Sequence, residues 1–365
     1  MSPVALRRQI GRLLIAGFNG SDLPVELRSL AREFGLGGVI LFARNIVEPD
    51  QVAELCRAAS RLTAELPAWT SVDQEGGRVA RLKAPFTEWP PMATLGRSGD
   101  VTLAERFARA LAAELRAVGI TLDFAPVLDI HTNPRNPVIG DRALAEKASE
   151  VARLGSAIVR ALQAENVAAC GKHFPGHGDT SADSHVELPL VEHPPERLRE
   201  VEFLPFRAAI DAGVAAIMTA HVLVPALDEE RPATLSRRIV SGLLRNELGF
   251  GGLIVSDDLE MRALAAEHAV PDSAVLAVEA GCDALLICGG DHDLQAAALE
   301  GLIHAVESDR LPLARVEDAL KRQQRAKERF LAQPAGTKLL GGKALRQALG
   351  RDEHQAIADE MSRFL

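Results

Sequence analysis

The sequence predicts a single-domain α/β protein that folds as a (β/α)8 barrel of the TIM type. Eight short apolar segments recur along the chain, and segments with a helical pattern separate them. The apolar segments lack the polar–apolar alternation that is typical of half-exposed strands, so we expect parallel strands buried on both faces. Eight is the number of parallel strands that closes this barrel.

The expected strands can be placed from their apolar residues. They span residues 13–18, 38–42, 69–73, 121–129, 167–174, 215–221, 252–258 and 283–288. An open, doubly wound sheet is the structural alternative. That fold would call for a phosphate-binding glycine fingerprint after the first strand, and Gly17-Phe18-Asn19-Gly20 is not that fingerprint.

The clearest helix is expected over residues 102–118. Four of its apolar residues lie four positions apart and so share one face of a helix: Leu103, Phe107, Leu111 and Leu115. Gly119 is well placed to end this helix. Comparable patterns predict helices over 22–34, 49–64, about 292–308 and about 314–332.

Composition and charge set the class of protein. Hydrophobic residues make up 47% of the 365, which is enough for a sizeable core and excludes bulk disorder. The net charge of −9 makes nucleic acid an unexpected partner. A basic tail begins at Ala335. We therefore assign residues 1–334 to the barrel and 335–365 to a helical or irregular C-terminal extension.

The chain carries no segment that predicts export or membrane insertion. Its first apolar segment is broken by Gly17, Asn19 and Gly20, and no window approaches the 18 apolar residues of a membrane span. Cysteines lie in apolar stretches, as expected for buried, reduced thiols: Cys56, Cys170, Cys282 and Cys288. We expect a cytoplasmic monomer that acts on a small molecule.

Polar side chains gather directly after the expected strands, where a parallel barrel places its active site. Residues 73–81 follow the third strand and Asp129 ends the fourth. Lys172 and His173 end the fifth strand, and His221 ends the sixth. The seventh strand ends in Ser256-Asp257-Asp258. Five such groups on one rim predict a functional site.

The densest polar segment runs from Gly171 to His185. It holds three histidines, two aspartates and a lysine, and His and Asp are suitable metal ligands. The sequence has no HExxH motif, and Lys172 would repel a cation, so a metal site is the less favoured interpretation. In the other interpretation, the segment is a structural loop whose histidines form hydrogen bonds with the backbone. This structural role suits His177 best.

The segment KHFPGHGDTSADSH resembles the signature of the β-N-acetylhexosaminidases of glycoside hydrolase family 3. Three companion segments follow the family's order: VDQEGGRVARL, GDRAL and IVSDDLEM. The short single-domain form resembles the bacterial cytoplasmic members that recycle the cell wall. The resemblance implies an enzyme that releases N-acetylglucosamine from 1,6-anhydro-N-acetylmuramic acid and its peptide conjugates. It implies no cofactor and no metal.

By position, the resemblance implies that Asp257 is the catalytic nucleophile and His185 the general acid/base, with Asp183 as the partner of His185. The remaining matched positions are those that bind the sugar: Asp73, Arg81, Arg142, Lys172 and His173. Asp258 competes with Asp257. Successive side chains of a strand point to opposite faces, so only one of the two can face the site, and the resemblance selects Asp257.

The chemistry of these residues agrees with those roles. A retaining glycosidase needs a carboxylate to form a glycosyl ester and a second group to protonate the leaving oxygen. Histidine can supply and remove that proton near neutral pH. Three alternatives stay open: a phosphorylase on the same scaffold, since a histidine acid/base would not repel phosphate, a non-catalytic sugar-binding protein, and a metal-dependent hydrolase.

Overall fold

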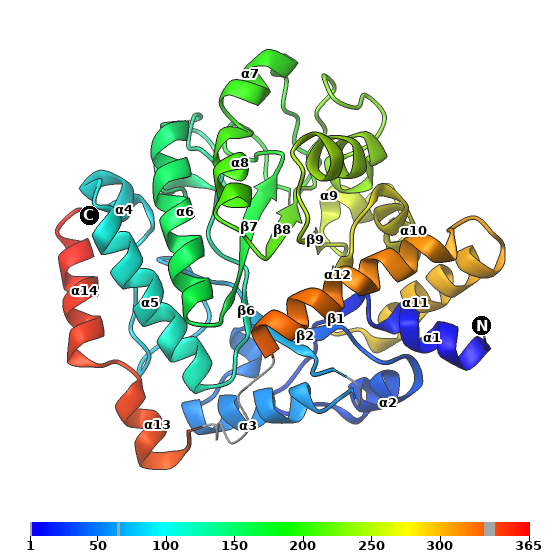
Figure 1. The fold of residues 1–365 in the computed structure, drawn as a ribbon, viewed down its shortest axis with the longest axis horizontal. Coiled ribbons are helices and arrows are strands. Elements are labelled where there is room, and N and C mark those ends of the chain that lie inside the picture. The colour runs from blue at the N-terminus through cyan, green and yellow to red at the C-terminus, as the bar shows by residue number, and fades with distance from the viewer. Residues whose placement is uncertain (1, 64–65, 185, 332–339) are drawn as a thin grey trace.

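The computed structural model describes residues 2–63, 66–184, 186–331 and 340–365. These residues form the predicted closed barrel of eight parallel strands (Figure 1). The strands are β1 (Leu14–Ala16), β2 (Gly38–Leu41), β3 (Trp69–Val72), β6 (Leu122–Asp123), β7 (Ala168–Phe174), β8 (Ala216–Thr219), β9 (Leu253–Asp258) and β10 (Ala284–Ile287). Each lies within its predicted segment, and β10 pairs with β1 to close the barrel. The predicted fold class is confirmed.

The fourth strand is much shorter than its predicted range of 121–129. β6 ends at Asp123; beyond it the Ala125 carbonyl accepts the Cys170 N–H of β7 at 2.9 Å, and an isolated bridge joins Val127 to Lys172. Pro126 lies between these two pairings and has no N–H to donate to a neighbouring strand. The segment therefore stays beside β7 without forming a continuous ladder.

Helices surround the barrel in the expected places. Before the C-terminal region they are α1 (Pro3–Gly11), α2 (Val25–Phe34), α3 (Pro49–Ser60), α4 (Ala93–Ser98), α5 (Val101–Ala117), α6 (Ala148–Ala164), α7 (Pro195–Glu200), α8 (Leu204–Asp211), α9 (Arg262–Ala265), α10 (Val270–Ala280), α11 (His292–Glu307) and α12 (Leu313–Leu331). Single 3-10 turns occur at Ala43–Asn45, Gly140–Arg142 and Ala233–Leu235, and a π-helical segment spans Arg238–Glu247.

Local chemistry explains where two of these helices begin. The predicted stripe of α5 is entirely buried, and the Asp100 side chain caps the helix by accepting the Thr102 N–H at 2.7 Å. α2 begins at Val25, three residues later than predicted, because Pro24 adopts an extended conformation as the residue before the helix. α3 ends at Ser60, short of the predicted end at residue 64.

Two apolar layers hold the barrel together. The interior is filled by side chains from alternate strand positions, such as Ile40, Trp69 and Phe124, and Phe330 and Leu331 of α12 pack against this interior cluster. A second layer fills the space between the strands and the helices. The four cysteines are buried and free, as predicted.

A short antiparallel hairpin follows β3 and was not predicted as a separate element. It pairs β4 (Gln74–Gly76) with β5 (Val79–Ala80). Gly76 and Gly77 turn the chain at φ 113° and 55°, where glycine avoids the clash that a side chain would suffer. This hairpin fixes the position of the polar residues between Asp73 and Arg81.

The C-terminal region adds two helices to one side of the barrel. α13 (Gly342–Ala348) contacts α3 and α5, and α14 (Asp352–Ser362) contacts α4 and α5 (Figure 1). The predicted boundary between residues 334 and 335 lies outside the described residues. Among the described helices, none is both long and apolar enough to cross a membrane.

Candidate active site

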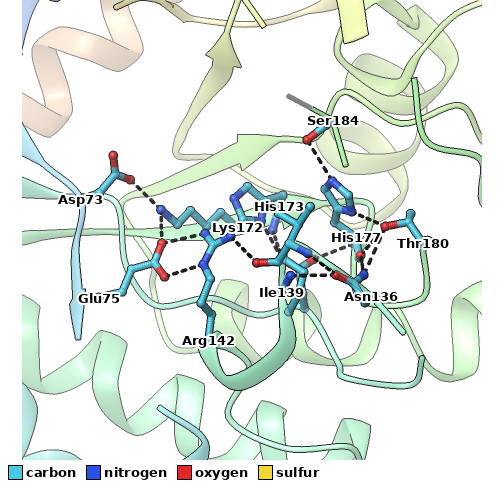
Figure 2. A network of polar contacts seen from close by, with 12 residues as sticks. Asp73, Glu75, Asn136, Ile139, Arg142, Lys172, His173, His177, Thr180 and Ser184 are labelled. Carbon is cyan, nitrogen blue, oxygen red and sulfur yellow. Dashed lines mark hydrogen bonds and ion pairs between the residues drawn. The ribbon is translucent and has the colours of Figure 1, made fainter. Parts of the chain in front are cut away.

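Lys172 lies at the centre of a buried network at the carboxyl end of the barrel (Figure 2). Its Nζ atom lies 2.7 Å from Oδ1 of Asp73 and 2.6 Å from Oε1 of Glu75, and its side chain is 2% exposed. Burial alone would lower the pKa of this ammonium group, but the two carboxylates more than offset burial and raise it. Lys172 is therefore charged, with one N–H left for a ligand.

Glu75 joins Lys172 to Arg142. Its two oxygens accept hydrogen bonds from Nε of Arg142 at 2.9 Å and from Nη2 at 2.8 Å, a bidentate arrangement. Burial favours the neutral acid, but Lys172 and Arg142 hold the pKa of the Glu75 carboxyl well below its usual range. Glu75 therefore neutralises cations that were expected to bind sugar, and fixes their positions.

Asp73 and Arg81 form the more accessible edge of the network. Nη2 of Arg81 lies 3.6 Å from Oδ2 of Asp73, and the two side chains are 27% and 16% exposed. The Arg81 guanidinium also lies over the Phe42 ring, 5.5 Å from its centre. Asp73 can accept hydrogen bonds from hydroxyl groups and Arg81 can donate hydrogen bonds, a combination that suits a sugar.

His173 is oriented by a buried carboxylate. Oδ2 of Asp129 lies 2.6 Å from Nδ1 of His173 and accepts the His173 backbone N–H at 3.1 Å. Burial would raise the pKa of the Asp129 carboxyl, but His173 and then His177 lower it. Because an ionised carboxylate only accepts, the ring proton of His173 belongs on Nδ1, which leaves Nε2 for a ligand.

His177 anchors the loop that follows β7. Its backbone N–H bonds to Asp129 at 2.6 Å, and its ring lies 2.7 Å from the Thr180 hydroxyl and 3.1 Å from the Ser184 hydroxyl (Figure 2). Burial lowers the pKa of His177 to about 4, so the ring is neutral at pH 7. A structural role suits His177, but its ring bonds to hydroxyl groups and not to the backbone.

Asn136 ties this loop to the loop after β6. Its Nδ2 donates to the His177 carbonyl at 2.8 Å, and its Oδ1 accepts the backbone N–H groups of Val138 and Ile139 at 2.9 and 2.7 Å. The Val138 carbonyl in turn accepts a hydrogen bond from Nη1 of Arg142 at 3.1 Å. The His173 and Lys172 networks are therefore one connected unit.

Asp257 and Asp258 end β9, a strand whose first four residues are buried. Burial would raise the pKa of Asp257, but the charges of His221 and His173 outweigh burial and lower it. Asp258 instead accepts the backbone N–H groups of Glu260 and Cys288 at 3.1 and 3.2 Å, and burial raises its pKa to about 7. Of the two neighbouring carboxyl groups, Asp257 is therefore the more acidic, whereas Asp258 is held by backbone N–H groups.

The loop that carries the acid/base candidate reaches the residues after β9. The Ser184 carbonyl accepts the Ala263 N–H of α9 at 3.2 Å. Asp183 is partly exposed, and its carbonyl accepts the N–H groups of Val186 and Glu187. His185 lies outside the described residues. Within the described part of the chain, no group of three metal-binding side chains is arranged to hold a metal ion.

Sequence reasoning missed Glu75 and Asp129 as site residues. Both lay in segments that had been singled out, Glu75 in VDQEGGRVARL and Asp129 at the end of a predicted strand. The available signal was the pairing of charges, because a buried Lys172 and Arg142 require a carboxylate between them. Of the predicted binding residues, Asp73, Arg81, Arg142 and Lys172 meet directly around Asp73 and Glu75.

Comparisons with known proteins agree with this geometry. The family model described as "Glycosyl hydrolase family 3 N terminal domain" matches residues 5–326. A "Beta-hexosaminidase" of Nitrosomonas eutropha is 44% identical over 259 residues, which cover 69% of this chain and 74% of the relative.

Two solved structures extend the likeness to the fold. A family 3 β-N-acetylglucosaminidase from a Paenibacillus species superposes with a TM-score of 0.93 at 44% identity, covering 98% of this chain and 68% of that one. NagZ from Neisseria gonorrhoeae, in complex with N-trifluoroacetyl-D-glucosamine, gives a TM-score of 0.78 at 31% identity, covering 96% and 97%. The chain therefore belongs to glycosyl hydrolase family 3, as a glycoside hydrolase of its β-N-acetylhexosaminidase group.

Proposed function

We propose that the protein is a retaining β-N-acetylglucosaminidase that acts on peptidoglycan fragments in the cytoplasm. Its substrate is N-acetylglucosamine linked to 1,6-anhydro-N-acetylmuramic acid, with or without peptide. One observation supports this most directly. A low-pKa carboxylate, Asp257, ends β9 on the same barrel rim as the Asp73–Lys172 pair, so a nucleophile and a sugar-binding acceptor share one face.

Asp257 acts first, as the nucleophile. Its lowered pKa keeps the carboxylate ionised at neutral pH, and one oxygen attacks the anomeric carbon while the bond to the leaving oxygen breaks. His185 donates its proton to that leaving oxygen. It then takes a proton from the water that hydrolyses the glycosyl ester. Asp183 orients the imidazole and stabilises its protonated form.

The binding residues hold the N-acetylglucosamine ring. Asp73 accepts hydrogen bonds from adjacent hydroxyl groups, and Arg81 and the third N–H of Lys172 donate hydrogen bonds to sugar oxygens. Three N–H groups of Arg142 donate hydrogen bonds to Glu75 and to the Val138 carbonyl. Arg142 therefore positions Glu75, and only its remaining N–H groups can donate to the sugar. The Nε2 atom of His173 is left to bond to the sugar.

Product analysis tests this proposal and separates it from phosphorolysis. The protein is incubated with p-nitrophenyl N-acetyl-β-glucosaminide and with the natural disaccharide, each with and without phosphate. We expect N-acetylglucosamine in every case. N-acetylglucosamine 1-phosphate in the phosphate samples would identify a phosphorylase, and turnover that chelator abolishes and zinc restores would identify a metal-dependent hydrolase.

The role of His185 is tested by the leaving group. His185→Ala should slow cleavage of the natural disaccharide far more than that of the nitrophenyl substrate, because a nitrophenolate leaves without a proton. Azide should partly rescue the nitrophenyl reaction, since it needs no base to attack the ester. Equal losses on both substrates with no azide response would leave His185 as a binding residue, and His173 would be the next acid to test.

A further inference from the structure

Gln74, the residue after Asp73, closes the β4–β5 hairpin with its side chain. Its Oε1 atom accepts the backbone N–H groups of Arg81 and Leu82 at 2.7 and 3.0 Å, and its Nε2 atom donates to the Leu82 carbonyl at 3.0 Å. The Gln74 side chain is buried, so water does not compete for these hydrogen bonds. Gln74 therefore fixes the backbone from which the Arg81 side chain extends.

Asp123 attaches this hairpin to the barrel. It is the last residue of β6, it lies opposite Val72 of β3, and it is 0% exposed. Its Oδ1 atom accepts the backbone N–H of Gln74 at 3.0 Å. A chain of hydrogen bonds therefore runs from the barrel through Asp123 and Gln74 to the backbone of Arg81.

The Arg81 side chain has few contacts of its own. Its Nη2 atom lies 3.6 Å from Oδ2 of Asp73, which is longer than a hydrogen bond. Its Nε atom is buried and has no hydrogen-bond partner among the described residues. The position of the guanidinium group therefore depends on the backbone that carries it, which Gln74 holds.

The contacts of Asp123 indicate that this acid is un-ionised. Its Oδ2 atom is buried and has no hydrogen-bond partner within the described parts of the chain. The ammonium group of Lys172 lies against Asp73 and Glu75 instead (Figure 2). A buried carboxylate with one hydrogen bond and no paired cation would be costly, so the acid keeps its proton. The proton belongs on Oδ2, because Oδ1 accepts the N–H of Gln74.

The electrostatic surroundings of Asp123 act in the same direction. Burial raises the pKa of the Asp123 carboxyl well above its usual range, and the negative charges of Asp73 and Glu75 add to this effect. The Gln74 N–H and the charge of Lys172 oppose the rise in pKa without cancelling it. As a neutral acid, Asp123 accepts the Gln74 N–H without competing for Lys172, which Asp73 and Glu75 already share.

We propose that Asp123, as an un-ionised acid, and Gln74 form a positioning pair that holds Arg81 opposite Asp73 for binding of the sugar. Asp123 fixes the backbone that follows Asp73, and Gln74 fixes the backbone of Arg81. Both residues act through Asp73 and Arg81 and do not touch the sugar themselves. The inference rests on the proposed roles of Asp73 and Arg81 as sugar-binding residues.

Inhibition by N-acetylglucosamine measures the sugar site without any bond being broken. We expect this sugar to inhibit turnover of the nitrophenyl substrate competitively. Asp123→Leu should raise the inhibition constant by about tenfold, because the Gln74 N–H loses its acceptor. Asp123→Asn should stay within about threefold of the wild-type value, because the amide oxygen accepts the same N–H and the amide is also uncharged. Equal losses in the two variants, or a folded Asp123→Leu that binds the sugar normally, would overturn the proposal.

Gln74→Met tests the second step, and it does so even if Asp123→Leu does not fold. The variant removes the three side-chain hydrogen bonds at a similar side-chain length. It should raise the inhibition constant by about tenfold in the wild-type background but add little in an Arg81→Ala background, because its effect passes through Arg81. Equal increases in both backgrounds would mean that Gln74 only stabilises the fold, and would overturn the proposal.

Ser71→Ala is the matched control. It removes a buried hydrogen bond from β3 to the Val39 carbonyl and none from the hairpin, so N-acetylglucosamine should inhibit it as it inhibits the wild-type protein. Weakening in this control equal to that in Gln74→Met would overturn the assignment.

The same measurements separate this inference from the proposed function. A wild-type protein that N-acetylglucosamine does not inhibit would contradict the proposed function, and the inference would fall with it. Inhibition that Arg81→Ala weakens, but that Gln74→Met and Asp123→Leu leave unchanged, would overturn the inference alone.

Discussion

At the scale of single residues, Asp257 and Asp258 show how neighbours in sequence acquire opposite chemistry. The charges of His221 and His173 lower the pKa of Asp257 against the effect of its burial. Asp258 receives two backbone N–H groups, but burial is stronger and raises its pKa to about 7. Of the two, only Asp257 is fully ionised at neutral pH, which its proposed role as the nucleophile requires.

Conservative amide variants should separate the two aspartates. Asp257→Asn should fold normally and lose several powers of ten in kcat, because an amide cannot form the glycosyl ester. Asp258→Asn should keep kcat within about tenfold, because the amide oxygen can still accept the N–H groups of Glu260 and Cys288. Steady-state kinetics on the nitrophenyl substrate measures both. The reverse pattern would show that Asp258 is the nucleophile.

His177 should make the stability of the protein depend on pH. Its pKa falls from 6.5 to about 4 on folding because the ring is buried, so the folded protein resists protonation. This contribution is fully present above pH 6.5 and is lost as the pH falls through 4. A shift of this size corresponds to roughly 3 kcal/mol. Urea unfolding should therefore show a smaller loss of stability between pH 7 and pH 4 in His177→Gln than in the wild-type protein.

The control for this measurement is His304→Gln, at an exposed histidine of α11. That variant should keep the wild-type dependence on pH. Parallel curves for the wild-type protein and His177→Gln would mean that the buried ring does not resist protonation. Carboxylates remote from His177 titrate alike in all three proteins, so the difference between His177→Gln and the control reports the imidazole together with its effect on Asp129.

The sequence identified several residues of the site, but it did not identify which of them form ion pairs with one another. The segments after the strands identified Asp73 and Lys172, and these do form an ion pair. The pairing of Glu75 with Arg142, which are 67 positions apart, could not be predicted, because no local pattern tells which carboxylate is buried beside which cation. His185 and its pairing with Asp183 remain predictions.

At the scale of elements, the loop after β7 depends on a glycine. A Cβ atom at Gly178 would lie 1.7 Å from the carbonyl oxygen of Ile130, in the loop after β6. Gly178→Ala should therefore force the two loops apart and lower the free energy of unfolding by about 1–3 kcal/mol. Activity should fall as well, because this loop carries Asp183. Thermal unfolding and kinetics measure the two effects.

Gly251→Ala is the matched control, since a Cβ atom there would have no neighbour within 4 Å. It should change the free energy of unfolding little. If Gly178→Ala were as stable and active as this control, the contact between the two loops would not constrain the site. The sequence showed a glycine at position 178 of the segment KHFPGHGDTSADSH, but it could not show that the carbonyl of Ile130 requires a glycine there. Ile130 lies 48 positions earlier in the chain.

The barrel strands were easier to predict than the shorter elements. Each strand is an apolar run because both of its faces are buried, and that signal is local. The β4–β5 hairpin has no such run, and only the positive φ angles of Gly76 and Gly77 define its turn. β6 was predicted too long because the interruption at Pro126 was not taken into account.

At the scale of the whole molecule, the barrel is held on one side by the C-terminal helices. Glu114 of α5 is the central contact, and it is 2% exposed. It accepts hydrogen bonds from the Thr87 N–H and hydroxyl at 2.9 and 2.7 Å and from the Gly350 N–H at 2.9 Å, and it lies 2.7 Å from Nδ1 of His354. Thr87 follows the segment that carries Arg81, so Glu114 links the C-terminal helices to the chain that leads out of the β4–β5 hairpin.

Deleting residues 340–365 should therefore destabilise the entire protein. Four large apolar side chains of this region are buried: Leu345, Leu349, Ile357 and Met361. Burial of each contributes roughly 1.5–3 kcal/mol, against a total stability of about 5–15 kcal/mol for a typical domain. We expect the truncated chain to be insoluble or to unfold at a much lower temperature.

The point variant His354→Ala should lower the free energy of unfolding by about 1–3 kcal/mol, since it removes one partner of the buried Glu114. Arg351→Ala, which breaks only an exposed ion pair with Glu353, should leave the melting temperature unchanged. A truncated protein that melts and turns over like the full chain would show that the barrel stands without these helices.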